Sequence, residues 1–110
     1  MAYDEDLAER IRELVAGEAK LSEMKMFGGL AFLVGGHMAV AARGQGGILV
    51  RVNPEESDAL VARTDAYPME MRGRQMQGWL RVDAENVKTN QKLKRWVERG
   101  VAYASSLPPK

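Results

Sequence analysis

The chain contains one long apolar stretch, Met24-Lys25-Met26-Phe27-Gly28-Gly29-Leu30-Ala31-Phe32-Leu33-Val34, which is closed by Gly35-Gly36. Ten of its eleven residues are apolar or glycine. Because successive side chains of a strand point to opposite faces, one strand here would be apolar on both. One face would carry Met24, Met26, Leu30, Phe32 and Val34, and the other Phe27, Ala31 and Leu33. Such a strand is normally covered on both sides, so we predict an interior strand over 24–34.

The composition indicates one small domain over residues 1–110 of a cytoplasmic protein. A chain of 110 residues is long enough to bury a core of its own. It has no cysteine, which excludes disulfides, thiolate metal sites and a cysteine nucleophile. The first residues do not resemble a signal peptide, and no apolar run approaches the ~20 residues that cross a bilayer. We therefore expect no contact with a membrane.

The remaining pattern predicts helices and hairpins around the central stretch. Asp4 to Ala16 has an apolar stripe of Leu7, Ile11, Leu14 and Val15, typical of an amphipathic helix. Glycine pairs allow tight turns, so 37–43 and 48–52 should be antiparallel strands joined by a turn at 44–47. Asn53-Pro54 starts a second helix that ends at residue 62 or 63.

Two further strands and a long helix complete the predicted order. Segments 68–72 and 79–83 alternate between apolar and polar residues, a helix runs from 85 or 86 to 104, and 105–110 is a flexible tail. The fold class is α+β, in two layers, with a five-stranded antiparallel sheet and the order α-β-β-β-α-β-β-α.

No pattern of reactive residues indicates an enzyme. His37 is the single histidine, with no partner nearby in sequence for a metal site or a general base. The glycines at 44–47 lack the lysine of a phosphate-binding loop and precede a strand. Glu70 and Asp83 lie on strands that also carry arginines, where ion pairs are the commoner arrangement. We predict no catalytic residue, cofactor, metal or small-molecule substrate.

One face of the predicted sheet is a candidate interaction surface. If strands 68–72 and 79–83 bury their apolar side chains, arginines and a tryptophan lie on the other face, and Arg51 falls on the corresponding face of its own strand. The candidate surface consists of Arg51, Arg72, Trp79 and Arg81. Arginine and tryptophan are frequent binding anchors, and bases can stack on tryptophan. The alternative is a solvated face on which Trp79 is covered by a helix or by a second copy.

A second candidate is a basic stripe on the last helix, formed by Lys88, Lys92, Arg95 and Arg99. These spacings place the four side chains on one side of the helix, where they could contact phosphates. The alternative is the solvated side of an amphipathic helix. We expect Tyr103 and the seven methionines to fill the core.

Several segments, taken in order, resemble the N-terminal domain of the TfoX/Sxy family of bacterial competence regulators. They are Met26-Phe27-Gly28-Gly29, Gly36-His37-Met38, Leu49-Val50-Arg51, Pro68-Met69, Trp79-Leu80, and a final helix with Trp96, Ala102 and Ala104. The resemblance spans about residues 8–104. It implies an α+β fold with an antiparallel sheet and a role in expressing DNA-uptake genes together with a cyclic-AMP-dependent activator. Full-length regulators also carry a helical C-terminal domain, so a stand-alone form is expected here, without catalytic residues to transfer.

The sequence thus predicts a non-enzymatic regulatory or binding domain whose partner is a protein or a second copy of itself. Nucleic-acid contact is a possible mode of action for the arginine surface or the basic stripe. The alternatives are a homodimeric structural protein and an enzyme of unrecognised type.

Overall fold

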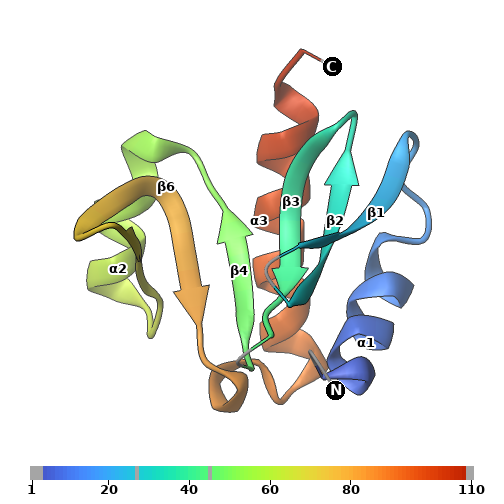
Figure 1. Cartoon of the computed structure of the whole chain (residues 1–110), viewed down its shortest axis with the longest axis horizontal. Helices are drawn as coiled ribbons and strands as arrows, with labels where there is room; N and C mark the ends of the chain where they lie inside the picture. Colours follow the sequence, from blue (N-terminus) through green and yellow to red (C-terminus); the bar gives the residue numbers. More distant parts are fainter. Residues whose placement is uncertain (1–3, 27, 45, 109–110) are drawn as a thin grey trace.

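The computed structural model describes residues 4–26, 28–44 and 46–108, without the side chain of Met71. Its elements are α1 (Glu5–Val15), β1 (Leu21–Met26), β2 (Gly29–Val34), β3 (His37–Ala42), β4 (Ile48–Arg51), the 3-10 helix η1 (Pro54–Glu56), α2 (Ser57–Arg63), β5 (Tyr67–Met71), β6 (Arg74–Val82), the 3-10 helix η2 (Ala84–Val87) and α3 (Asn90–Ser106). The strands form one antiparallel sheet in the order β1-β2-β3-β4-β6-β5 (Figure 1). The α+β class is therefore confirmed.

The sheet has six strands rather than the predicted five, because the stretch 24–34 is a hairpin. Gly28 has a positive φ of 76°, and β1 pairs back along β2 from Met26 opposite Gly29 to Leu21 opposite Val34. Glycine adopts this conformation at little cost, which makes it suited to a tight turn. The prediction of an interior strand is right for β2, which is buried throughout, and wrong for β1, which forms an edge of the sheet. Phe27 lies outside the described residues.

The hairpin also changes which side chains share a face. Directly opposed residues of an antiparallel pair point to the same side of the sheet. Met24 lies opposite Ala31, and Lys25 lies opposite Leu30. Met24 and Met26 consequently share the face of Ala31. The prediction of a single strand placed them on the face of Phe32, and it is wrong on this point.

All three helices lie on the Phe32 side of the sheet, and the core lies between the helices and the sheet (Figure 1). Asp4 caps α1 by accepting a hydrogen bond from the Leu7 backbone N–H at 3.2 Å, and the predicted stripe of this helix faces the core. The core includes Leu7, Ile11 and Val15 of α1, Leu30 and Phe32 of β2, Val40 of β3, Ile48 and Val50 of β4, Leu60 of α2, Leu80 and Val82 of β6, and Leu93, Trp96 and Val97 of α3.

Three predicted boundaries are corrected. The last helix begins at Asn90, where the Thr89 hydroxyl accepts a hydrogen bond from the Lys92 N–H, because η2 occupies the preceding residues. It continues to Ser106, so the tail predicted for 105–110 begins later, and 109–110 lie outside the described residues. The second of the two late strands was predicted to begin at residue 79, but β6 already starts at Arg74, so most of the segment between the two predicted strands is itself strand.

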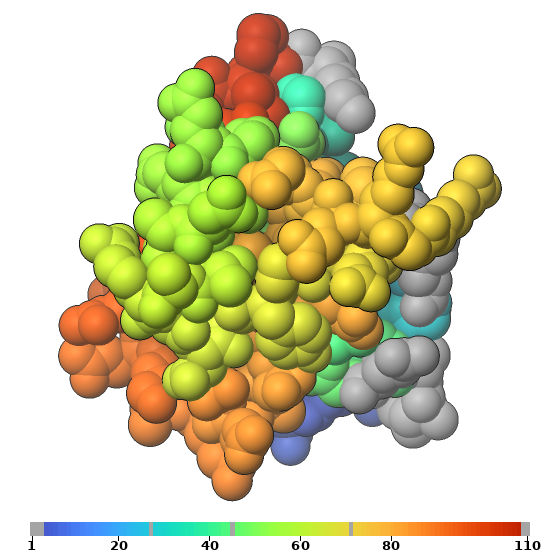
Figure 2. All heavy atoms as spheres, turned by 90° about the vertical axis from the view of Figure 1, so that its left-hand side faces the viewer, coloured from blue at the N-terminus to red at the C-terminus, as the bar shows by residue number. Residues whose placement is uncertain are grey.

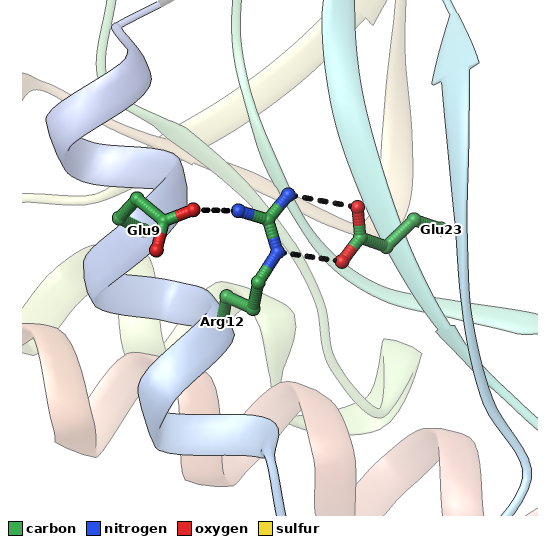
Figure 3. A network of polar contacts seen from close by, with 3 residues as sticks. All are labelled: Glu9, Arg12 and Glu23. Carbon is green, nitrogen blue, oxygen red and sulfur yellow. Dashed lines mark hydrogen bonds and ion pairs between the residues drawn. The ribbon is translucent and has the colours of Figure 1, made fainter.

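An ion-pair network joins α1 to the edge strand β1 (Figure 3). The Arg12 guanidinium donates to both carboxylate oxygens of Glu23, at 2.7 and 2.9 Å, and also to Glu9. These hydrogen bonds lower the pKa of Glu23 below its usual 4.5, and the positive charge of Arg12 adds to the effect, whereas burial opposes it. The bidentate geometry anchors the exposed hairpin to the helical layer.

The Glu23→Gln variant should lose up to about 1 kcal/mol of unfolding free energy at pH 7, the range of exposed ion pairs. Because the folded pKa of Glu23 lies below its unfolded pKa, the pair stabilises the protein above about pH 4.5 and ceases to do so as the pH falls through the folded value. Urea denaturation of both proteins at pH 7 and at about pH 3 measures this. If Glu23→Gln lost the same unfolding free energy at both pH values, the stabilising role given to the Arg12–Glu23 pair would be contradicted.

Candidate interaction face

The side of the sheet opposite the helices carries a second, separate apolar cluster. Its buried members are Ala31, Leu33 and Ala41, and Met26, Met38 and Leu49 pack against them partly exposed. The strand registers extend this surface to Met24, Met69, Met76, Trp79 and Arg81, since opposed residues share a face. We call these eleven residues the open face. No helix within the described residues packs over it.

Methionine is the most frequent residue of the open face. All five methionines whose side chains are described lie there: Met24, Met26, Met38, Met69 and Met76. Met24 is 50% exposed and Met76 36%, and the other three are half-buried. The prediction that methionines fill the core is therefore wrong for the exposed Met24 and Met76, whereas Met26 and Met38 pack against the buried cluster on this side of the sheet. Flexible, polarizable methionines suit a surface that adapts to another molecule.

A groove of ≈ 260 Å³ runs across the open face. Met26 lines it from the β1–β2 hairpin, Met38 and Leu49 from the middle of the sheet, and Met69 from the β5 edge. The groove spans the sheet because the sheet is strongly twisted, with β1 turned obliquely against β2 (Figure 1). Arg43, Glu70 and Arg81 supply charged groups to its lining. The groove is thus mainly apolar with a few polar groups, the usual character of a binding site.

The structure brings together three of the four residues of the predicted arginine surface. Arg51 lies opposite Trp79, and its guanidinium is 4.9 Å from the centre of that indole ring. It is also 5.5 Å from the ring of Tyr103, a residue of α3 that the sequence did not single out for binding. Arg81 is the next open-face residue along β6. Arg51 therefore stacks on two aromatic rings instead of standing free in solvent.

Arg72 does not belong to the open face. It was predicted at the end of a strand, but it lies in the turn between β5 and β6 with a positive φ of 55°. Its side chain is exposed in the β5–β6 hairpin, whose side chains project from the surface in Figure 2 (yellow to orange). Alternation along the sequence could not reveal this, because the strand ends one residue earlier.

Tyr67, which is hydrogen-bonded to Asp83, lies beside Arg81 at the side of the groove. The Tyr67 hydroxyl donates a hydrogen bond to Asp83 Oδ1 at 2.8 Å, and the Arg81 guanidinium lies 5.7 Å from the Tyr67 ring centre. The hydrogen bond to Asp83, then burial, raises the pKa of Tyr67 above its usual 10.0, whereas Arg43 acts in the opposite direction. Tyr67 therefore remains protonated at neutral pH and keeps its aromatic face toward Arg81.

The residues of the predicted basic stripe are exposed on the helical layer, although the first of them lies outside the last helix. Lys88, Lys92, Arg95 and Arg99 are all exposed. Lys88 precedes α3, and the guanidinium of Arg99 rests 4.8 Å from the ring centre of Trp96. Lys92 and Arg95 thus point outward from a helix that packs on the other side of the sheet from the open face.

The remaining polar groups form no reactive centre among the residues that the structure describes. His37 Nε2 lies 2.7 Å from the carbonyl oxygen of Pro108, which ties the segment after α3 to the start of β3. Within the described ranges, no group of three or more histidine, cysteine and acidic side chains could hold a metal ion. None of the helices described is long and apolar enough to cross a membrane.

Comparison with known proteins gives one result. The family model of the TfoX N-terminal domain matches residues 13–104 of the 110-residue chain. No curated protein shows significant similarity. The matched range includes all six strands, α2 and nearly all of α3, and so the whole open face.

Proposed function

Since this chain belongs to the TfoX N-terminal domain family, we propose that it is a non-enzymatic regulatory domain that acts in the control of DNA-uptake genes by holding a protein partner on its open face. The family makes it a competence-regulator-like domain. The observation that supports the binding mode is the grouping of Met24, Met26, Met38, Met69 and Met76 on a sheet face that no described helix covers.

The chemistry of the groove favours an amphipathic protein segment as the occupant. Side chains such as Met38 and Leu49 offer apolar area, and burying them releases about 25 cal/mol per Å². Methionine side chains rearrange easily, so they can pack against a partner of irregular shape. Arg81 and Glu70 line the same groove and provide polar contacts that orient the bound segment.

Placing a charge on the open face should abolish partner capture. In a pull-down from the source cells, Met38→Glu and Met69→Glu are each expected to lower recovery of the partner by about tenfold or more, equivalent to ~1.4 kcal/mol of lost binding. Lys94→Gln is the matched control, because it changes the charge by the same amount at an exposed position of α3 outside the basic stripe. Circular dichroism checks that the variants fold. The same proteins recovered with every variant would refute the proposal.

Nucleic-acid contact is the second candidate, and we assign it to the stripe on α3. Lys92 and Arg95 are exposed on α3 and Lys88 is exposed just before it, whereas one side of the Trp79 ring is occupied by Arg51. Binding through the stripe should weaken steeply with salt, and Lys92→Gln should reduce the salt slope by about one. Fluorescence anisotropy with a DNA duplex at low and moderate salt measures this. Absence of binding at low salt would eliminate the candidate.

A further inference from the structure

The two edges of the sheet differ in their protection against pairing with another strand. The edge strand β5 contains Pro68, and its register shifts between Pro68 and Met69. Proline and bulges are common devices that keep an edge from pairing. The other edge, β1, pairs with β2 in unbroken register and has no proline. Its residues 22–25 are exposed, so β1 is the edge that can accept a further strand.

The free hydrogen-bonding groups of β1 can be assigned to particular residues. The Lys20 carbonyl accepts a hydrogen bond from the Gly35 N–H at 3.1 Å, beyond the last pair of the β1–β2 ladder. Along an antiparallel strand, residues alternate between bonding to one neighbour and to the other. Even-numbered residues of β1 therefore bond to β2. Leu21, Glu23 and Lys25 direct their N–H and C=O groups away from the sheet.

We propose that two copies of this chain pair antiparallel through β1, with Met24 on the two-fold axis. In this register, Glu23 lies opposite Lys25 of the second copy, and the reverse pair forms on the other side of the axis. Both pairs use the backbone groups that β2 leaves free, so four hydrogen bonds close around Met24. A C₂ interface of this kind is self-complementary by symmetry.

Charge selects this register over its neighbours. Moving the axis to Glu23 places the two Glu23 side chains opposite each other, and moving it to Lys25 does the same for the lysines. Opposite charges directly across a pair of strands stabilise it and like charges destabilise it. Glu23 and Lys25 both project on the helical side of the sheet, where Arg12 already holds Glu23 in an extended position.

Pairing through β1 would place the open faces of the two copies side by side. The two-fold axis of an antiparallel strand pair that continues a sheet runs perpendicular to it, so both open faces lie on one side. Met24, which is 50% exposed in one copy, would then pack against Met24 of the second copy. The dimer presents one continuous methionine-lined surface. The inference does not depend on the proposed function, because it uses the edge of the sheet and not its groove.

Charge exchange between two variants tests the register directly. The full chain should sediment as a dimer at about 50 μM, and Lys25→Glu, which keeps the Arg12–Glu23 pair, should weaken dimerisation by about tenfold or more. Glu23→Lys should do the same. An equimolar mixture of the two variants should recover the dimer, since every cross-strand pair then joins opposite charges.

Lys20→Glu is the matched control, because Lys20 is exposed and lies outside the strand. It should leave the dimer unchanged, and circular dichroism establishes that each variant is folded. A monomeric wild-type chain at about 100 μM would overturn the inference. A dimer that Lys25→Glu does not weaken, or two variants that stay monomeric when mixed, would overturn it equally.

Discussion

Replacing Phe32 by alanine is expected to remove about 3–5 kcal/mol from the free energy of unfolding. Phe32 is fully buried and is the largest of the completely buried side chains. It projects from β2 into the core between the sheet and the helices. Truncation would leave a cavity bounded by well-packed neighbours, and the loss is large beside the 5–15 kcal/mol of a typical domain.

Met24→Ala is the control for this experiment, since it removes an apolar side chain of the same hairpin from the other face. Met24 is 50% exposed, so its truncation should change stability by no more than about 0.5 kcal/mol. Chemical denaturation of dilute protein, monitored by circular dichroism, compares both variants with the wild type. Similar losses for the two would contradict the assignment of these faces.

Gly100→Ala should destabilise the protein by about 1–3 kcal/mol, although alanine is the better helix former. Gly100 lies in α3 where the helix crosses β3, and a Cβ atom there would stand 2.2 Å from the carbonyl oxygen of Ala39. The nearest atoms belong to the Ala39 backbone, which cannot rotate away, so relief requires the helix to move away from the sheet. That displacement would loosen the packing of Trp96 and Val97.

Gly17→Ala provides the contrast for Gly100→Ala. Nothing lies within 4 Å of the position that its Cβ would take, and its φ is not positive. Its substitution should be neutral or should stabilise by up to about 1 kcal/mol through the unfolded chain. Thermal melts of both variants test the difference. An unchanged melting temperature for Gly100→Ala would show that α3 does not lie as close to β3 as described.

Local patterns predicted the helical layer well. The predicted apolar stripe of α1 faces the core, and Asn53 starts the second helical segment as predicted, because its side-chain oxygen accepts a hydrogen bond from the Glu55 N–H. The positive φ values of Gly35 and Gly36 confirm the turn between β2 and β3. These features depend on residues close together in sequence, so the sequence contains the information that determines them.

The open face could not be predicted because it depends on contacts between distant segments. The run from Met24 to Val34 is apolar or glycine except at Lys25, so alternation cannot show that Gly28 reverses the chain. That reversal moves Met24 and Met26 to the face of Ala31. Whether this face is covered depends on all three helices packing on the opposite side, which no local pattern reveals.

The arginine surface illustrates the same limit. Period-two alternation placed Arg51 and Trp79 on the same face, and the structure sets the two residues opposite each other on neighbouring strands. It did not reveal the contact of Arg51 with Tyr103, because that residue belongs to α3, the last helix of the chain. Arg72 was misplaced for a smaller reason, since the positions of strand ends are the least certain part of a sequence-based prediction.

The most direct test of the account is the solvent exposure of the methionine methyl groups. With ¹³C-methyl-labelled methionine and leucine and a soluble paramagnetic agent, NMR signals broaden in proportion to their contact with solvent. The signals of Met24 and Met76 should broaden most in dilute protein, those of Met26, Met38 and Met69 to an intermediate degree, and those of the buried Leu93 should stay sharp. Methionine signals as protected as those of Leu93 would show that the open face is covered, and would contradict the proposed mode of binding.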